Sequence, residues 1–184
     1  MKQPGAWKDR SQGEDATRLQ RAEMGARLAA LEYRSLSEEL RSATVFAPPI
    51  DPAGDPPAPL GAVLPAAWEY GNLAQVTVPL GRIAWLSGAD SLPTIAIHVP
   101  DLPAGQLARE LADLLGEHHR RPFARLYFCC ETLVPVPFLG RYGFACSWLD
   151  GSGVGTVAPL LAAKFGTTQV RALVGGAVLW SREQ

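Results

Sequence analysis

The fold is decided by residues 123–149, FARLYFCCETLVPVPFLGRYGFACSWL, in which two apolar runs flank a connection containing proline and glycine. The runs ARLYFCC at 124–130 and FACSWL at 144–149 are short and rich in apolar residues, which is typical of buried strands. We expect the connection VPVPFLGRYG at 134–143 to be a rigid link rather than a site. This stretch therefore predicts the middle of a β-sheet.

A strand and a helix are predicted just before the first of these runs. TIAIHV at 94–99 is rich in β-branched residues and apolar on both faces, which favours a strand covered on both sides. After Pro103, leucines at helical spacing give a helix one apolar face; they are Leu107, Leu111, Leu114 and Leu115. His118 and His119 end this helix, where we expect a capping or solvated role. The strand–helix–strand order predicts parallel strands joined by a right-handed crossover.

The chain on either side of this unit predicts further strands and a short helix. A glycine-rich loop at 150–155 leads into a helix at 156–165, which Gly166 is suited to terminate. TQVRALV at 168–174 and AVLWS at 177–181 predict antiparallel strands joined by a two-glycine turn. Earlier in the chain, QVTVPL at 75–80 and RIAWL at 82–86 predict a hairpin or two short edge strands.

Together these elements predict an α/β fold. We expect a mixed, centrally parallel sheet flanked by helices, a Rossmann-like sandwich, with an N-terminal helix appended. The predicted organisation is a disordered tail at 1–14, an amphipathic helix at 15–43, a proline-rich linker at 44–66 and the α/β domain at 67–184.

The N-terminal helix carries an apolar stripe whose members recur at alternating spacings of three and four. They are Leu19, Ala22, Ala26, Ala29, Tyr33, Leu36 and Leu40. Such a heptad stripe indicates either a helix packed on its own domain or a seam for a second copy or another protein. A second stripe of Met24, Leu28 and Leu31 lies beside it, and Gly25 inside the pattern weakens the helix.

Charge and cysteine content narrow the classes of function. Lys and Arg number 17 and Asp and Glu 18, a balance that provides no field to attract nucleic acid. No apolar run approaches the length of a membrane span. The cysteines number 3, an odd count with two of them adjacent, which does not resemble a secreted disulfide framework. We therefore expect a cytoplasmic protein that does not bind nucleic acid and has no membrane span.

Polar residues follow three of the predicted strands. If those strands are parallel, their carboxyl ends meet at one edge of the sheet, where ligands of open α/β sheets bind. The candidate catalytic residues at this edge are His98, Asp101, Cys130, Glu131 and Asp150. No spacing predicts a metal site, and no motif predicts a cofactor.

The loop after the third of these strands is a candidate ligand-binding segment. Glycines before a helix expose N–H groups that can bind an anion. The residues concerned are Gly151, Ser152, Gly153, Gly155 and Thr156. Because GxGxG departs from the dinucleotide motif GxGxxG, the alternative is a flexible connection capped by Ser152 or Thr156.

The cysteines and tryptophans are ambiguous in sequence. Cys129 and Cys130 are adjacent in a strand, so their side chains point to opposite faces. Cys130 can be a buried apolar residue or a nucleophile with His98 as its base. Strand patterns contain Trp85, Trp148 and Trp180, which favours core packing for all of them.

The sequence thus favours a non-catalytic binding or assembly module. Its predicted contact is the N-terminal helix, docked on another copy in a homo-oligomer or on another protein. The alternative is an enzyme or small-ligand binder that uses the strand-end edge of the α/β domain.

Overall fold

A computed structural model describes residues 8–42, 44–47 and 75–182 of the chain. Most of the predicted linker, at 48–66, and parts of the predicted tail and domain, at 1–7, 67–74 and 183–184, lie outside the described residues. Within the described ranges, no helix is both long and apolar enough to cross a membrane.

The core of the fold is a five-stranded sheet with the strand order β3-β2-β1-β4-β5. The strands are β1 (Thr94–Val99), β2 (Arg125–Cys130), β3 (Ala145–Trp148), β4 (Thr167–Ala172) and β5 (Val178–Ser181). The first four strands are parallel, and β5 pairs antiparallel with β4. This is the strand order of a doubly wound sheet, so the predicted centrally parallel α/β fold is confirmed.

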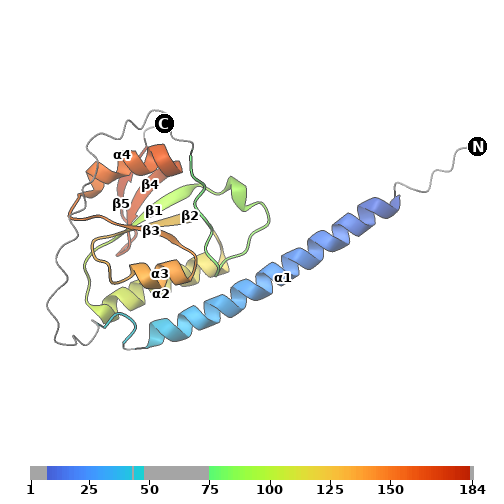
Figure 1. Ribbon diagram of the computed structural model, residues 1–184, viewed down its shortest axis with the longest axis horizontal. Helices are drawn as coiled ribbons and strands as arrows, with labels where there is room; N and C mark the ends of the chain where they lie inside the picture. Colours follow the sequence, from blue (N-terminus) through green and yellow to red (C-terminus); the bar gives the residue numbers. More distant parts are fainter. Residues whose placement is uncertain (1–7, 43, 48–74, 183–184) are drawn as a thin grey trace, which may run out of the picture.

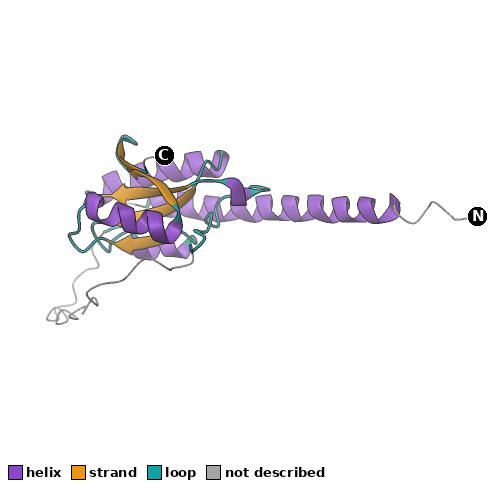
Figure 2. Cartoon of the chain, turned by 90° about the horizontal axis from the view of Figure 1, so that it is seen from above, coloured by secondary structure: helices purple, strands orange, loops and turns teal. Residues whose placement is uncertain are grey.

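Helices cover the sheet unequally on its two faces (Figures 1 and 2). Helices α2 (Ala104–Arg120) and α3 (Val136–Arg141) pack on one face, and α4 (Val154–Phe165) packs on the other. A 3-10 turn, η2 (Ala89–Ser91), precedes β1. The layers thus form a three-layered α/β sandwich in which α1 lies outside α2.

Strand β2 shows why the central strands form where the sequence predicts them. All of its residues are buried, because helices or loops cover both faces of a central parallel strand. Cys130 belongs to the core on the α2 side and Cys129 to the core on the α4 side, as strand alternation requires. Strand β1 has the predicted bounds and pairs residue for residue with β2.

Helix α1 (Lys8–Arg41) has 34 residues and is therefore about 51 Å long. It begins ahead of the predicted start at Asp15, so residues 8–14, assigned to a tail from sequence, are helical. Its C-terminal half lies along α2 and α3, whereas its N-terminal half projects beyond the domain (Figures 1 and 2). The turn that follows also differs from the predicted linker, since Phe46 is buried against Phe138.

The prediction of a hairpin or two short edge strands at 75–86 is wrong, because these residues contain no strand. The Val76 N–H donates to the Lys164 carbonyl and the Arg82 N–H to the Tyr142 carbonyl, so the segment bonds to separate elements instead of to itself. Gly81 has a φ of 86° and lies so close to the Phe144 ring that a side chain would overlap it. The segment is extended chain that crosses the end of the α/β domain.

Two smaller predictions also need correction. The connection 134–143 contains a helix, α3, which begins after Pro135. Neither Ser152 nor Thr156 caps α4, whose N-cap is Gly153 without a side-chain hydrogen bond. In contrast, Gly166 ends α4 in the left-handed conformation, and the turn before β5 has the predicted positive φ at both glycines.

Candidate functional site

The carboxyl ends of β1 and β2 bring His98 and Glu131 into contact. The His98 Nε2–H donates to Glu131 Oε1 at 2.9 Å, and the Asp101 backbone N–H donates to Glu131 Oε2 at 3.0 Å. The His98 side chain is 15% exposed and that of Glu131 44%, so the pair lies at the surface of the sheet edge. Because Nε2 is engaged, the Nδ1 atom of a neutral His98 ring is the one that can accept a proton.

Trp148 at the end of β3 completes this edge. Its indole N–H donates to the backbone carbonyl of Glu131 at 3.1 Å, and the residue is 49% exposed. The sequence predicted a core role for Trp148, which is wrong because β3 is the edge strand and ends here. Alternation along an isolated strand gives no signal of its position in the sheet, so sequence reasoning missed this residue.

Asp150 and the glycine-rich loop follow directly from Trp148. The Leu149 N–H donates to the Cys130 carbonyl, which fixes the start of this loop beside β2. Asp150 has a φ of 45°, a left-handed conformation that Asp tolerates better than most residues. The predicted anion-binding residues Gly151, Ser152, Gly153, Gly155 and Thr156 are all exposed.

Cys130 does not have the properties of a nucleophile. Its side chain is fully buried in the core on the α2 side, and burial raises the pKa of its thiol to about 12. The ring of His98, its predicted base, is bound to Glu131 instead. Cys130 therefore belongs to the core. Hydrogen bonds at the edge site join His98, Asp101, Glu131 and Trp148, and Asp150 lies in the loop that follows and forms no hydrogen bond with them within the described ranges.

The other two histidines, His118 and His119, lie at the far end of α2 and have a structural role. His118 Nε2 donates to the Leu80 carbonyl at 3.0 Å and His119 Nδ1 to the Ile83 carbonyl at 2.6 Å. His118 is fully buried, its Nδ1 has no hydrogen-bond partner within the described ranges, and burial lowers its pKa from the ordinary 6.5. The capping or solvated role predicted for His118 is therefore wrong, because its ring bonds to the Leu80 carbonyl and is covered by residues 80–83 and aromatic rings.

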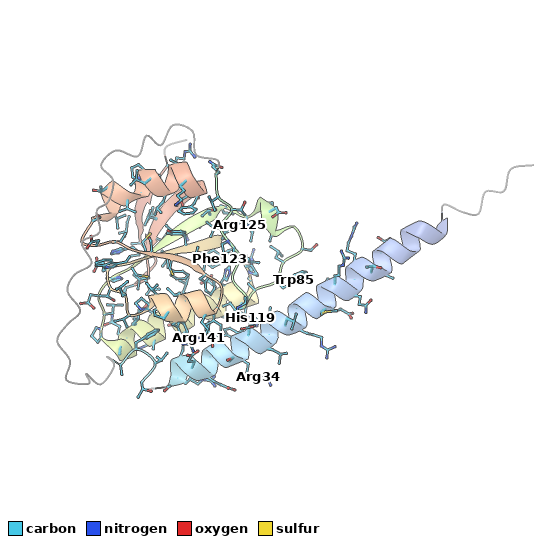
Figure 3. All side chains as sticks on the ribbon, in the orientation of Figure 1. Arg34, Trp85, His119, Phe123, Arg125 and Arg141 are labelled. Atoms are coloured by element: carbon cyan, nitrogen blue, oxygen red, sulfur yellow. The ribbon has the colours of Figure 1, made fainter. Side chains whose placement is uncertain are left out.

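Helix α1 meets the domain along one side. Tyr33 stacks on His119 with ring centroids 4.0 Å apart, and Glu39 accepts hydrogen bonds from Arg141 and from the Tyr142 hydroxyl. Figure 3 shows Trp85, His119 and Arg141 on the side of α1 that faces the domain and Arg34 on the other side. Gly25 is required here, since a Cβ at this position would overlap the Trp85 indole.

The predicted partner-binding stripe of α1 is divided between two environments. Ala29, Leu36 and Leu40 are buried within the chain, and Tyr33 is partly buried. Leu19 and Ala26 are exposed and Ala22 is half-buried. The second stripe, which the sequence placed beside the first, is exposed throughout: Met24 by 54%, Leu28 by 56% and Leu31 by 59%.

Comparisons with protein-family models, curated proteins and solved structures found no match to this chain. In the described part of the chain, no group of three or more His, Cys, Asp or Glu side chains is placed to hold a metal ion. The geometry itself is therefore the source of functional inference.

Proposed function

We propose that this chain is a non-catalytic assembly module that associates with a second copy through the outward face of α1, defined by Met24, Leu28 and Leu31. The observation that carries the proposal is the presence of two apolar faces on one helix. At about 100° per residue, the outward residues fall within roughly 60° of one another and between roughly 80° and 160° from the buried residues Ala29 and Leu36.

The energetics favour a weak to moderate association. Each outward side chain is about half exposed, and burying its exposed part contributes on the order of 1 kcal/mol per side chain. The free energy gained by burying three such residues per copy, reduced by the cost of ordering side chains, corresponds to micromolar or weaker binding between two copies. A surface of this kind suits a reversible assembly.

The test is sedimentation equilibrium of the full chain from about 1 to about 200 µM, a range that spans such affinities. We expect the intact chain to dimerise and the double variant Leu28→Gln/Leu31→Gln to sediment as a monomer with unchanged thermal stability. The matched control is Leu133→Gln/Val134→Gln, which removes equally exposed apolar residues elsewhere and retains dimerisation. A monomeric intact chain, or a Leu28/Leu31 variant that still dimerises, contradicts the proposal.

A second candidate function is ligand binding at the strand-end edge, and the His98–Glu131 contact favours it. His98 lies on β1 beside β4, at the point where the strand order reverses and where doubly wound sheets bind ligands. The three loops at this edge carry Asp101, Glu131 and Asp150 and contain neither Lys nor Arg at 98–103, 131–136 or 148–153. With an exposed Trp148 beside these carboxylates, the edge suits a cationic ligand with an apolar portion.

Calorimetric titration with benzyltrimethylammonium, and with benzoate as the anionic control, tests this second function. We expect binding of the cation alone, weakened at least tenfold by Glu131→Gln and by Trp148→Leu. Equal binding of the cation to the intact chain and to both variants contradicts a site at this edge, as does an absence of binding.

A further inference from the structure

Part of one face of the sheet has no covering helix in the part of the chain that the structure describes. Helices α2 and α3 lie over β1, β2 and β3, whereas β4 and β5 on the same side are open. The cause is the two-glycine hairpin between β4 and β5, which replaces the crossover helix that a parallel strand would need. The result is a groove of about 520 Å³ between α2 and the β4–β5 hairpin.

The groove has an apolar floor and one acidic wall. Ile95, Ile97 and Phe123 form the floor, and Figure 3 marks Phe123. On the α2 wall, Glu117 lines the groove beside Leu114, and Glu110 lies two turns earlier on the same flank of the helix. Neither glutamate forms an ion pair with a described residue.

The opposite wall of the groove is less charged. Arg171 lines it, and both Nε and Nη2 of this residue donate to the Gln169 side chain, at 3.0 and 2.9 Å. Beyond it on β5, Leu179 is 46% exposed. An apolar helix face with basic residues along one side therefore matches the groove in both polarity and charge.

We infer that this groove receives the outward face of α1 from a second copy of the chain, an inference that rests on the proposed function. Arg27 and Arg34 lie seven residues apart on one side of that face, at helical angles of roughly 80° and 60° against roughly 120° to 180° for Leu31, Met24 and Leu28, and thus have the spacing of Glu110 and Glu117. Both arginines are exposed and form no ion pair within the described ranges. These arginines can therefore form ion pairs with the unpaired glutamates of the groove.

Two alternatives within the dimer fit less well. Direct pairing of two α1 helices would place Arg21 and Ser35 in the seam on either side of Met24, Leu28 and Leu31, which is shorter than a stable coiled coil requires. The chain's own α1 cannot fill its own groove, because α1 is bound to the other flank of α2 through Tyr33 and His119. The partner helix must therefore come from another molecule.

The arrangement is reciprocal in a two-fold dimer, since each copy offers one helix and one groove. Two helix-in-groove contacts double the buried surface, which brings the interface toward the roughly 1,600 Å² of a stable complex. The apolar helix face and the apolar groove would then cover one another.

A charge exchange tests the inference by sedimentation and by mixing differently labelled chains. The groove variant Glu110→Arg/Glu117→Arg and the helix variant Arg27→Glu/Arg34→Glu should each self-associate at least about tenfold more weakly than the intact chain. An equimolar mixture of the two should form a heterodimer of nearly the original affinity, because both contacts then join opposite charges. All four positions are at the surface, and thermal unfolding verifies that each variant is folded.

The control variant is Asp15→Arg, which makes the same charge change per residue at an exposed position on the side of α1 opposite Met24 and Leu28 and should leave association unchanged. If the helix variant and Leu28→Gln/Leu31→Gln weaken association while the groove variant does not, the groove assignment is overturned and the proposed assembly through α1 stands. If neither variant of α1 weakens association, the proposed function fails together with the inference. Weakening by Asp15→Arg, or a mixture that does not restore affinity, also overturns the groove assignment.

Discussion

The two faces of α1 are similar in composition and differ in what covers them. The inner face presents Leu36 and Leu40, which pack in the main core, and Ala29, which is buried beside the segment that contains Trp85. The outward face presents Met24, Leu28 and Leu31 to solvent. Leucine dominates both faces, so the hydrophobic pattern alone does not distinguish them. The comparison teaches that periodicity identifies an apolar helix face, while the number of such faces indicates how many neighbours the helix needs.

The largest effect in this comparison is expected from Leu36→Ala. Leu36 is 1% exposed in the main core, and truncation of such a leucine leaves a cavity that lowers the free energy of unfolding by about 2–5 kcal/mol. Urea denaturation measures this change. A loss below about 1 kcal/mol would mean that the inner face of α1 is not part of the cooperative core.

Gly25→Ala should reveal the close approach of the Trp85 loop to the inner face. In the intact chain we expect destabilisation of about 1–2 kcal/mol, because the new methyl group overlaps the indole. In a Trp85→Ala background the same substitution should stabilise by up to about 1 kcal/mol through helix propensity. Thermal unfolding of the intact chain, the two single variants and the double variant gives both stability changes. If Gly25→Ala changes stability in the same direction in both backgrounds, the contact with Trp85 is refuted.

Acid pH should lower the stability of the fold through His118, which binds residues 80–83 beside the inner face of α1. The folded His118 has a lowered pKa, so below about 6.5 the unfolded chain binds more protons than the folded chain. The free energy of unfolding should therefore fall with decreasing pH, by at most about 1.4 kcal/mol per pH unit, until the folded pKa is reached. His118→Gln should flatten this slope in urea titrations between pH 7.5 and 5.5; an unchanged slope would assign it to other groups.

The smallest effect on stability is expected on the outward face. Leu31→Ala removes a side chain that is 59% exposed, so the free energy of unfolding of a dilute monomer should change by less than about 0.5 kcal/mol. Urea denaturation at low protein concentration measures it. A loss comparable to that of Leu36→Ala would show that the two faces are equally covered and would remove the basis of the comparison.

The regular part of the fold was predictable from sequence because its signals are local. The strand at 94–99 and the helix after Pro103 have strong periods, and two glycines specify the turn before β5. Segment 75–86 was not predictable, because its hydrogen bonds go to Lys164 and Tyr142, residues remote in sequence. Helix α3 is short and contains Pro137 in its first turn, so no period revealed it.

The edge site was predictable only in part. The rule for parallel strands correctly placed His98, Asp101 and Glu131 at one edge, where the structure shows their hydrogen bonds. The role of Trp148 depends on β3 being the outermost strand, a property of the whole sheet that local sequence does not encode. The burial of His118 likewise depends on residues 80–83 crossing the end of α2.

The contacts of α1 have a consequence for synthesis of the chain on the ribosome. Glu39 and its partner Arg141 are 102 residues apart, so α1 emerges well before the helices that cover its inner leucines. At about 5–20 residues per second, these leucines remain uncovered for roughly 5–20 s. During that interval both apolar faces of the nascent helix are open to chaperones. The completed domain afterwards buries only the inner face.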